Sequence, residues 1–204
     1  MKEFISNLEE KLAQKEKVNS SCLLIIFIGE SGVGKSTFCS GMGLQDNLYI
    51  SSQAMIDALK QRGKPINHDT IHEFGVKAYT ENPRWQVPNI LEAMKGKEFF
   101  CLDGPRTIKE VEALIEEHPF TLIVRIASSE EDRFRRLQAR DGINEEAFQR
   151  ILTDESQQTG LNQILALSDL TIENNGSLEH IQQQALEFKD SLLKALKERG
   201  QNEI

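Results

Sequence analysis

Short apolar runs alternate along the chain with longer segments whose apolar residues recur at helical spacing. The clearest run is Leu23–Ile28, six aliphatic and aromatic residues without a polar interruption. A strand covered on both faces needs no polar alternation, so this run predicts a buried strand. Four further short segments predict strands at 47–51, 98–104, 120–128 and 169–174. Because helical segments separate them, we expect an α/β fold: a three-layer α/β/α domain with a five-stranded parallel sheet.

The helical segments divide the chain into regions. Residues 1–20 carry an apolar stripe on an otherwise charged segment and predict an N-terminal helical extension that packs on the body, self-associates or contacts a partner. Residues 21–204 are expected to form one domain. Within it, residues 53–95 predict several helices punctuated by Gly63, Pro65 and Pro83. A long final helix is expected after Ser177, whose hydroxyl suits a helix N-cap.

Charge and hydrophobicity exclude some classes of partner. The 204 residues carry a net charge of −8, which argues against nucleic acid or an anionic membrane as the main partner. The longest apolar run, Cys22–Ile28, is too short to span a bilayer, and the first residues are too charged for a secretory signal. Three cysteines with no zinc-type spacing indicate reduced, buried thiols. A cytoplasmic location is the expectation.

A glycine-rich turn follows the first predicted strand. The sequence FIGESGVGKST matches the G-x-x-x-x-G-K-[ST] pattern, with a buried strand before it and a helix after it. Backbone N–H groups of such a loop point at phosphate oxygens, so ATP and Mg²⁺ are the expected ligands. Lys35 is expected to reach the β- and γ-phosphates, Ser36 to bind Mg²⁺, and Thr37 to support the α-phosphate side. The predicted nucleotide-binding residues are Gly29, Ser31, Gly32, Val33, Gly34, Lys35, Ser36 and Thr37. A chance glycine turn is the alternative.

A second motif separates the classes of nucleotide-binding protein. The chain has neither the D-x-x-G and N-K-x-D motifs of a GTPase nor the S-G-G-Q motif of a transport ATPase. It has instead CLDGPRT, residues 101–107. Asp103, at the end of a buried strand, is expected to hold the hydration shell of Mg²⁺, and Arg106 to bind an anionic substrate. The alternative is that Asp103-Gly104-Pro105 is only a turn.

Three arginines share a face of the next predicted helix. Arg133, Arg136 and Arg140 follow one another at helical spacing. Positive charge is what a transferring phosphoryl group requires, so Arg136 and Arg140 join Lys35 and Asp103 as candidate catalytic residues. The alternative is a solvated helix face paired with neighbouring acids.

These motifs resemble the nucleoside-monophosphate kinase group of the phosphate-loop proteins. CLDGPRT is similar to the D-G-F-P-R-T of adenylate kinases with one residue missing, and Arg136 and Arg140 match the R-x-x-x-R that opens their lid. RLQARDGINEEAFQRI and LSDLTIENNGSLEHI resemble patterns of dephospho-CoA kinases and of their archaeal relatives. The resemblance implies an acceptor-binding helical region at 53–95 and a short lid at 136–158. It also implies that Asn174 and Gly176 lie under the adenine base.

The acceptor side departs from the family pattern. Where adenylate kinases have an aspartate and an arginine after the second strand, the register gives Ala54 and Asp57. Arg106, Arg62 and Ser51 are the remaining acceptor-side candidates. The sequence therefore predicts an ATP- and Mg²⁺-dependent phosphotransferase that acts on a small, phosphate-bearing, nucleotide-like acceptor, either a nucleoside monophosphate or a dephospho-CoA-type molecule. The alternative is a nucleotide-binding regulatory protein or ATPase with a degenerate acceptor site.

Overall fold

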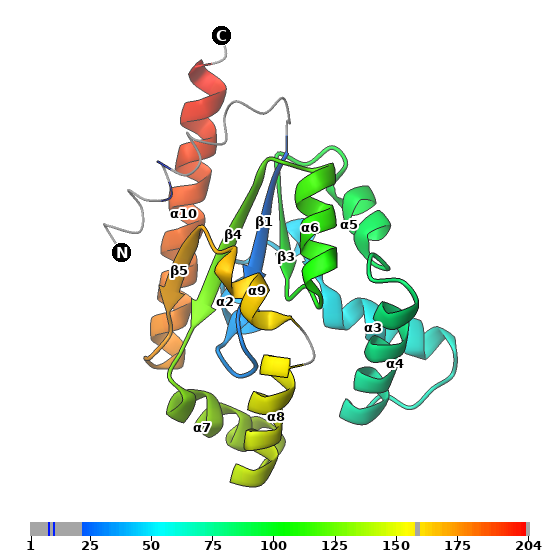
Figure 1. Cartoon of the computed structure of the whole chain (residues 1–204). Coiled ribbons are helices and arrows are strands. Elements are labelled where there is room, and N and C mark those ends of the chain that lie inside the picture. Colours follow the sequence, from blue (N-terminus) through cyan, green and yellow to red (C-terminus); the bar gives the residue numbers. More distant parts are fainter. Residues whose placement is uncertain (1–7, 9, 11–21, 158–159, 203–204) are drawn as a thin grey trace.

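A computed structural model describes residues 8, 10, 22–157 and 160–202 (Figure 1). Its strands are β1 (Leu23–Ile28), β2 (Leu48–Ile50), β3 (Phe99–Asp103), β4 (Thr121–Ala127) and β5 (Leu170–Glu173). The helices are α2 (Lys35–Gly41), α3 (Ser51–Gln61), α4 (His68–Glu81), α5 (Val87–Met94), α6 (Ile108–Glu117), α7 (Glu130–Asp141), α8 (Glu145–Gln157), α9 (Leu161–Ala166) and α10 (Leu178–Asn202), with a 3₁₀ turn at Gln45–Asn47. The predicted N-terminal helix lies almost wholly outside the described residues.

The five strands form one parallel sheet in the order β2-β3-β1-β4-β5. The predicted fold class is therefore confirmed. β1 lies at the centre, between β3 and β4, so the strand order reverses direction at its carboxyl end. In open parallel sheets, ligands bind in the crevice at this switch point. The turn after β1 is the predicted phosphate loop.

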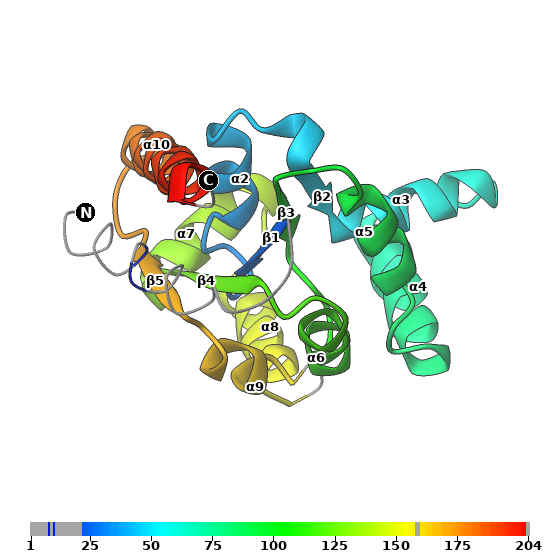
Figure 2. The same ribbon diagram turned by 90° about the horizontal axis from the view of Figure 1, so that it is seen from above.

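Each face of the sheet buries its own apolar cluster. Leu23, Ile25 and Phe27 of β1 face a cluster that includes α2 and α10, whereas Leu24 and Ile26 face one that includes α5, α6 and α9. Figure 2 shows the sheet between these two layers. Leu8 is fully buried in the cluster of α2 and α10. Burial on both faces explains why β1 is uninterrupted by polar residues.

Two helical regions flank the carboxyl edge of the sheet. α7 and α8 form a hairpin below this edge, and α3 to α5 lie beside β2 and β3 (Figure 1). Gly142, with a φ of 68°, ends α7 in the left-handed conformation that glycine favours. Ser51 was expected to close the second strand, but it begins α3. Among the described residues, no helix is long and apolar enough to cross a bilayer.

Candidate active site

The backbone conformation and close packing of the phosphate loop favour glycine. Gly29 and Gly34 have φ values of 147° and 94°, which side-chain-bearing residues rarely adopt. A Cβ atom on Gly34 would lie 2.6 Å from Nδ2 of Asn174, and one on Gly29 would lie 2.3 Å from the carbonyl oxygen of Ile126. The backbone is thus packed closely against β4 and the loop after β5, which fixes the direction of its N–H groups.

Asn174, which directly follows β5, braces the phosphate loop through a side-chain hydrogen bond. Its Nδ2 donates to the carbonyl oxygen of Val33 at 2.8 Å, and the side chain is 2 % exposed. Its backbone N–H donates to Ala127 at the end of β4. The side chain therefore contacts the phosphate loop, while Asn174 and Gly176 also line the cavity described below. Their predicted contact with an adenine base stays a prediction.

The Lys35 side chain contacts the first residues of the phosphate loop. Its Nζ donates to the carbonyl oxygens of Gly29 and Glu30 at 2.6 and 3.0 Å. An ammonium group has three donors, so one is left for a phosphate oxygen. Burial lowers the pKa of Lys35, and the charge of Asp103 opposes that shift. Held by two carbonyls, Lys35 lines the cavity, and its contact with the phosphates stays a prediction.

Ser36 and Asp103 meet at the carboxyl ends of β1 and β3. The Ser36 hydroxyl donates to Oδ2 of Asp103 at 2.7 Å, and Asp103 is 4 % exposed. Mg²⁺ prefers oxygen ligands, and in phosphate sites it keeps several waters while one or two protein oxygens hold it. A hydroxyl and a carboxylate beside the phosphate loop fit this requirement. The two residues predicted to hold the metal are therefore neighbours in space, although 67 positions separate them.

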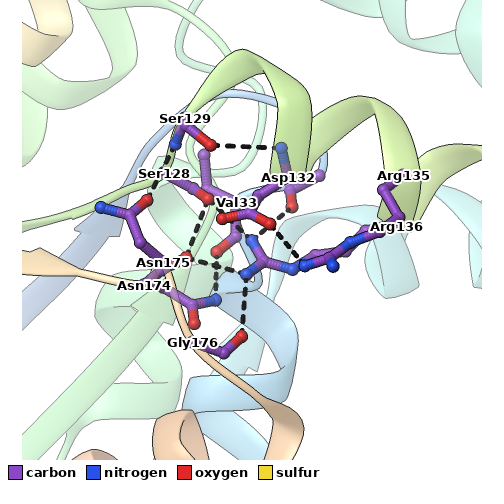
Figure 3. Close-up of polar contacts among 10 residues, drawn as sticks. Val33, Ser128, Ser129, Asp132, Arg135, Arg136, Asn174, Asn175 and Gly176 are labelled. Atoms are coloured by element: carbon purple, nitrogen blue, oxygen red, sulfur yellow. Dashed lines mark hydrogen bonds and ion pairs between the residues drawn. The ribbon is translucent and has the colours of Figure 1, made fainter.

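Arg136 is held by protein oxygens rather than by a charged partner. Figure 3 shows its guanidinium among Ser128 and the loop that follows β5. It donates to the Ser128 hydroxyl at 2.9 Å and to the carbonyl oxygens of Asn174 and Gly176 at 2.8 and 3.4 Å. Nη2 thus ties α7 to the loop of Asn174, whereas Nη1 bonds Ser128 and, at 3.4 Å, the carbonyl oxygen of Gly32 in the phosphate loop. Contact of Arg136 with a transferring phosphoryl group stays a prediction, because these nitrogens already have acceptors.

The other two arginines of the predicted stripe, Arg133 and Arg140, differ in their surroundings. Arg140 pairs with Asp141 through two hydrogen bonds, and its side chain is 69 % exposed at the rim of the cavity. Arg133 is buried: it donates to the Ser31 carbonyl oxygen at 2.9 Å and pairs with Glu155 of α8 at 2.6 Å. In the predicted stripe, Arg133 is therefore a buried structural residue and Arg140 is an exposed cation.

The acceptor side is less complete than the donor side. Arg106 lines the cavity and is exposed, and its charge contributes to lowering the pKa of Lys35. Ser51 is fully buried, and its neighbour Ser52 lines the cavity instead. Arg62 lies over the ring of Phe74, 4.8 Å from its centroid, and does not line the cavity. The structure thus brings one of the three acceptor-side candidates to the site.

The phosphate loop, Asp103 and Arg106 border one cavity of about 770 Å³ at the carboxyl edge of the sheet. Small-molecule sites have volumes of about 300 to 1,000 Å³. Its walls include the phosphate loop, the 103–106 segment, α7, α8 and the loop after β5. Asp103 and Glu155 are the acidic residues among the described residues of its lining.

The sequence suggests that Glu155 orders the lid arginines and groups Arg133 with Arg136 and Arg140. In the structure Glu155 pairs with Arg133, and its contact with the phosphate loop is the part that the sequence does not predict. Glu155 accepts the backbone N–H of Ser31 at 2.5 Å, so a lid carboxylate contacts the phosphate loop directly. Arg133 belongs to the helical stripe that the spacing revealed.

Comparisons with known proteins agree with this architecture. No family model matches the chain. A UPF0200 protein of Aeropyrum pernix is 26% identical over 170 residues, which cover 80% of this chain and 90% of the relative. This similarity agrees with the resemblance to archaeal relatives.

Solved structures share the fold at low sequence identity. A shikimate kinase of Acinetobacter baumannii, solved with shikimate, has a TM-score of 0.57 and 16% identity over 88% of this chain and 95% of its own. A shikimate kinase of Bacteroides thetaiotaomicron has a TM-score of 0.56 and 16% identity over 84% and 98%. The chain therefore has the fold of the phosphate-loop kinases.

Proposed function

We propose that this protein is an ATP- and Mg²⁺-dependent phosphotransferase that moves the γ-phosphate to a small, nucleotide-like acceptor. The observation that carries the proposal is the convergence of Lys35, the Ser36–Asp103 pair and Arg106 on one cavity. A phosphoryl donor site and a cation for an anionic acceptor are then within one enclosure. The fold shared with shikimate kinases supports a kinase reaction without naming its acceptor.

The chain's own residues supply positioning and charge. Loop amides and Lys35 hold the phosphate chain, and phosphoryl transfer depends almost entirely on such positioning and electrostatic stabilisation. The Ser36 hydroxyl and Asp103 would hold Mg²⁺, which would supply positive charge to the phosphate oxygens. Arg140, exposed on α7, supplies a further cation when the lid closes and excludes water.

The nature of the acceptor determines whether a base is needed. A phosphate acceptor such as a nucleoside monophosphate is already ionised and needs none. A hydroxyl acceptor, such as that of dephospho-CoA, requires a base. Of the two acids that line the cavity among the described residues, Asp103 is the candidate base: one of its oxygens accepts the Ser36 hydroxyl, whereas both oxygens of Glu155 are bound, by Ser31 and by Arg133.

The experiment is a transfer assay with matched variants. Protein, ATP and Mg²⁺ are incubated with nucleoside monophosphates, dephospho-CoA, shikimate or gluconate, and ADP is measured against a control without acceptor. We expect acceptor-dependent ADP from the nucleotide-like compounds. Lys35→Ala abolishes it, whereas Lys95→Ala, on a surface lysine paired with Glu92, does not. Acceptor-dependent turnover that survives in Lys35→Ala disproves the assigned site.

One observation favours the alternative, a nucleotide-binding regulatory protein or ATPase. Asp57 stands where the adenylate kinase pattern has an arginine. In α3 it is exposed, bonded to Gln53 and 3.6 Å from Lys60. Equal ADP production with and without every acceptor would support this alternative.

A further inference from the structure

The lid carries an acidic side chain that contacts the phosphate loop. Glu155 belongs to α8, and its Oε1 accepts the N–H of Ser31 at 2.5 Å. The side chain is 15 % exposed and lines the cavity. A backbone amide of a phosphate loop is a donor for anions, and here a carboxylate of the protein itself occupies it.

A buried arginine holds this carboxylate in place. Arg133 of α7 pairs with Oε2 of Glu155 at 2.6 Å and donates through Nε to the Ser31 carbonyl oxygen at 2.9 Å. Its guanidinium lies 5.7 Å from the ring centroid of Phe148 in α8. The N–H and C=O of one loop residue are therefore both bound by an ion pair that spans the two helices of the lid. Movement of that pair moves the lid relative to the loop.

The position of Ser31 in the loop indicates which phosphate the carboxylate meets. Thr37, at the start of α2, is expected on the α-phosphate side, and the lysine of this pattern, Lys35, is expected to reach the β- and γ-phosphates. Ser31 precedes both, at the opposite end of the loop, and so lies nearest the terminal phosphate. A nucleoside diphosphate leaves this end empty. A triphosphate brings negative charge beside the carboxylate, which like-charge repulsion disfavours.

We propose that Glu155 makes the donor site discriminate between nucleoside triphosphate and diphosphate. In the diphosphate state, Glu155 stays on the Ser31 amide and the lid stays fixed to the loop. In the triphosphate state, the γ-phosphate displaces Glu155 from Ser31, and the lid hairpin is released to rearrange over the cavity. A ligand shifts such an equilibrium only by its difference in affinity for the two states, and the γ-phosphate supplies that difference. This inference rests on the proposed function, since it assumes that the loop binds ATP.

The test compares two nucleotides and two charge-removing variants. Dissociation constants for ADP·Mg²⁺ and for the imido analogue of ATP with Mg²⁺ are measured by calorimetry. Glu155→Gln removes the charge but keeps a side-chain oxygen that accepts the Ser31 N–H. Glu146→Gln, also on α8, removes an exposed charge that pairs only with Arg150 within the described part of the lid and serves as the matched control.

The expected result is specific to the triphosphate. Removing a like charge beside the position assigned to the γ-phosphate tightens binding of the ATP analogue by about 10- to 100-fold, while ADP binding changes by less than about threefold. Glu146→Gln leaves both constants unchanged. In hydrogen exchange of the wild type, the ATP analogue alters amide protection in α7 and α8 and ADP does not.

Other results overturn the inference. If Glu155→Gln weakens binding of ADP and of the ATP analogue equally, Glu155 only supports the structure of the loop. The phosphotransferase proposal then still stands if the wild type forms acceptor-dependent ADP. If neither nucleotide binds the wild type, both proposals fail. Thermal unfolding tests whether Glu155→Gln is folded. Should it not fold, Glu155→Asp, which withdraws the charge by one methylene, must shift the ratio of the two constants in the same direction by a smaller factor.

Discussion

Glu110 provides a pH-dependent test of how the acceptor side is built. This glutamate of α6 is fully buried, and it accepts the N–H of Arg106 at 2.8 Å and the hydroxyl of Tyr79 at 3.1 Å. Burial raises the pKa of Glu110 from 4.5 to about 7, although the hydrogen bonds from Arg106 and Tyr79 oppose the shift. The proposed perturbation is Glu110→Gln, which keeps an acceptor for both donors and cannot ionise.

The sign of the effect follows from proton binding. Because the folded pKa lies above the unfolded one, the folded state binds more protons between about pH 4.5 and 7, so the wild type loses stability as pH rises through that window. At about 1.4 kcal/mol for each pH unit, the difference between 4.5 and about 7 corresponds to about 3 kcal/mol. Glu110→Gln has no such loss. Its advantage over the wild type therefore grows by up to about 3 kcal/mol between about pH 5 and 8.

Urea unfolding measures this difference directly. Trp85 is the sole tryptophan, and its ring packs against Tyr79 at a centroid distance of 5.9 Å, so its fluorescence reports on this region. Unfolding free energies are compared for wild type, Glu110→Gln and Glu112→Gln, an exposed carboxylate of the same helix that serves as the control. Parallel pH profiles for wild type and Glu110→Gln would refute the reasoning, because they would mean that Glu110 does not change its protonation on folding.

Two further predictions concern the two halves of the site. Asn174→Ala leaves the buried carbonyl oxygen of Val33 without its donor, so we expect a loss of about 1 to 3 kcal/mol in unfolding free energy and weaker ATP binding. The exposed variant Asn175→Ala is the comparison in thermal unfolding and calorimetry, and an equal loss in both would contradict the bracing role. Arg106→Ala removes the exposed cation of the acceptor side and should raise the acceptor KM by about 10- to 100-fold with little change in the KM for ATP. Arg84→Ala, which breaks a surface pair with Glu116, should change neither KM in steady-state kinetics.

The donor side was predictable because its signals are local. A strand, a glycine-rich turn, a lysine and a hydroxyl follow one another within Leu23–Ser36, and each has a conformational or chemical reason at its own position. Asp103 was equally legible, because an acid that ends a buried strand must lie at the carboxyl edge of a parallel sheet. The pairing of Ser36 with Asp103 follows from that topology alone.

The rest depends on partners that spacing cannot identify. Helical periodicity grouped Arg133 with Arg136 and Arg140, but it does not show that Arg133 meets Ser31 and Glu155 across the lid. Arg136 donates to backbone carbonyl oxygens of Asn174 and Gly176, and a pattern of side chains does not predict bonds to backbone oxygens. Arg62 was an acceptor-side candidate only because it is positively charged. It follows α3, and its guanidinium lies over the ring of Phe74.

The brace between Asn174 and Val33 has a consequence for synthesis. The two residues are 141 positions apart, and the asparagine follows the last strand of the sheet. Gly34 therefore packs against Asn174 only after most of the chain has been made. A nascent chain that carries the whole G-x-x-x-x-G-K-[ST] motif does not yet carry the contact that braces it.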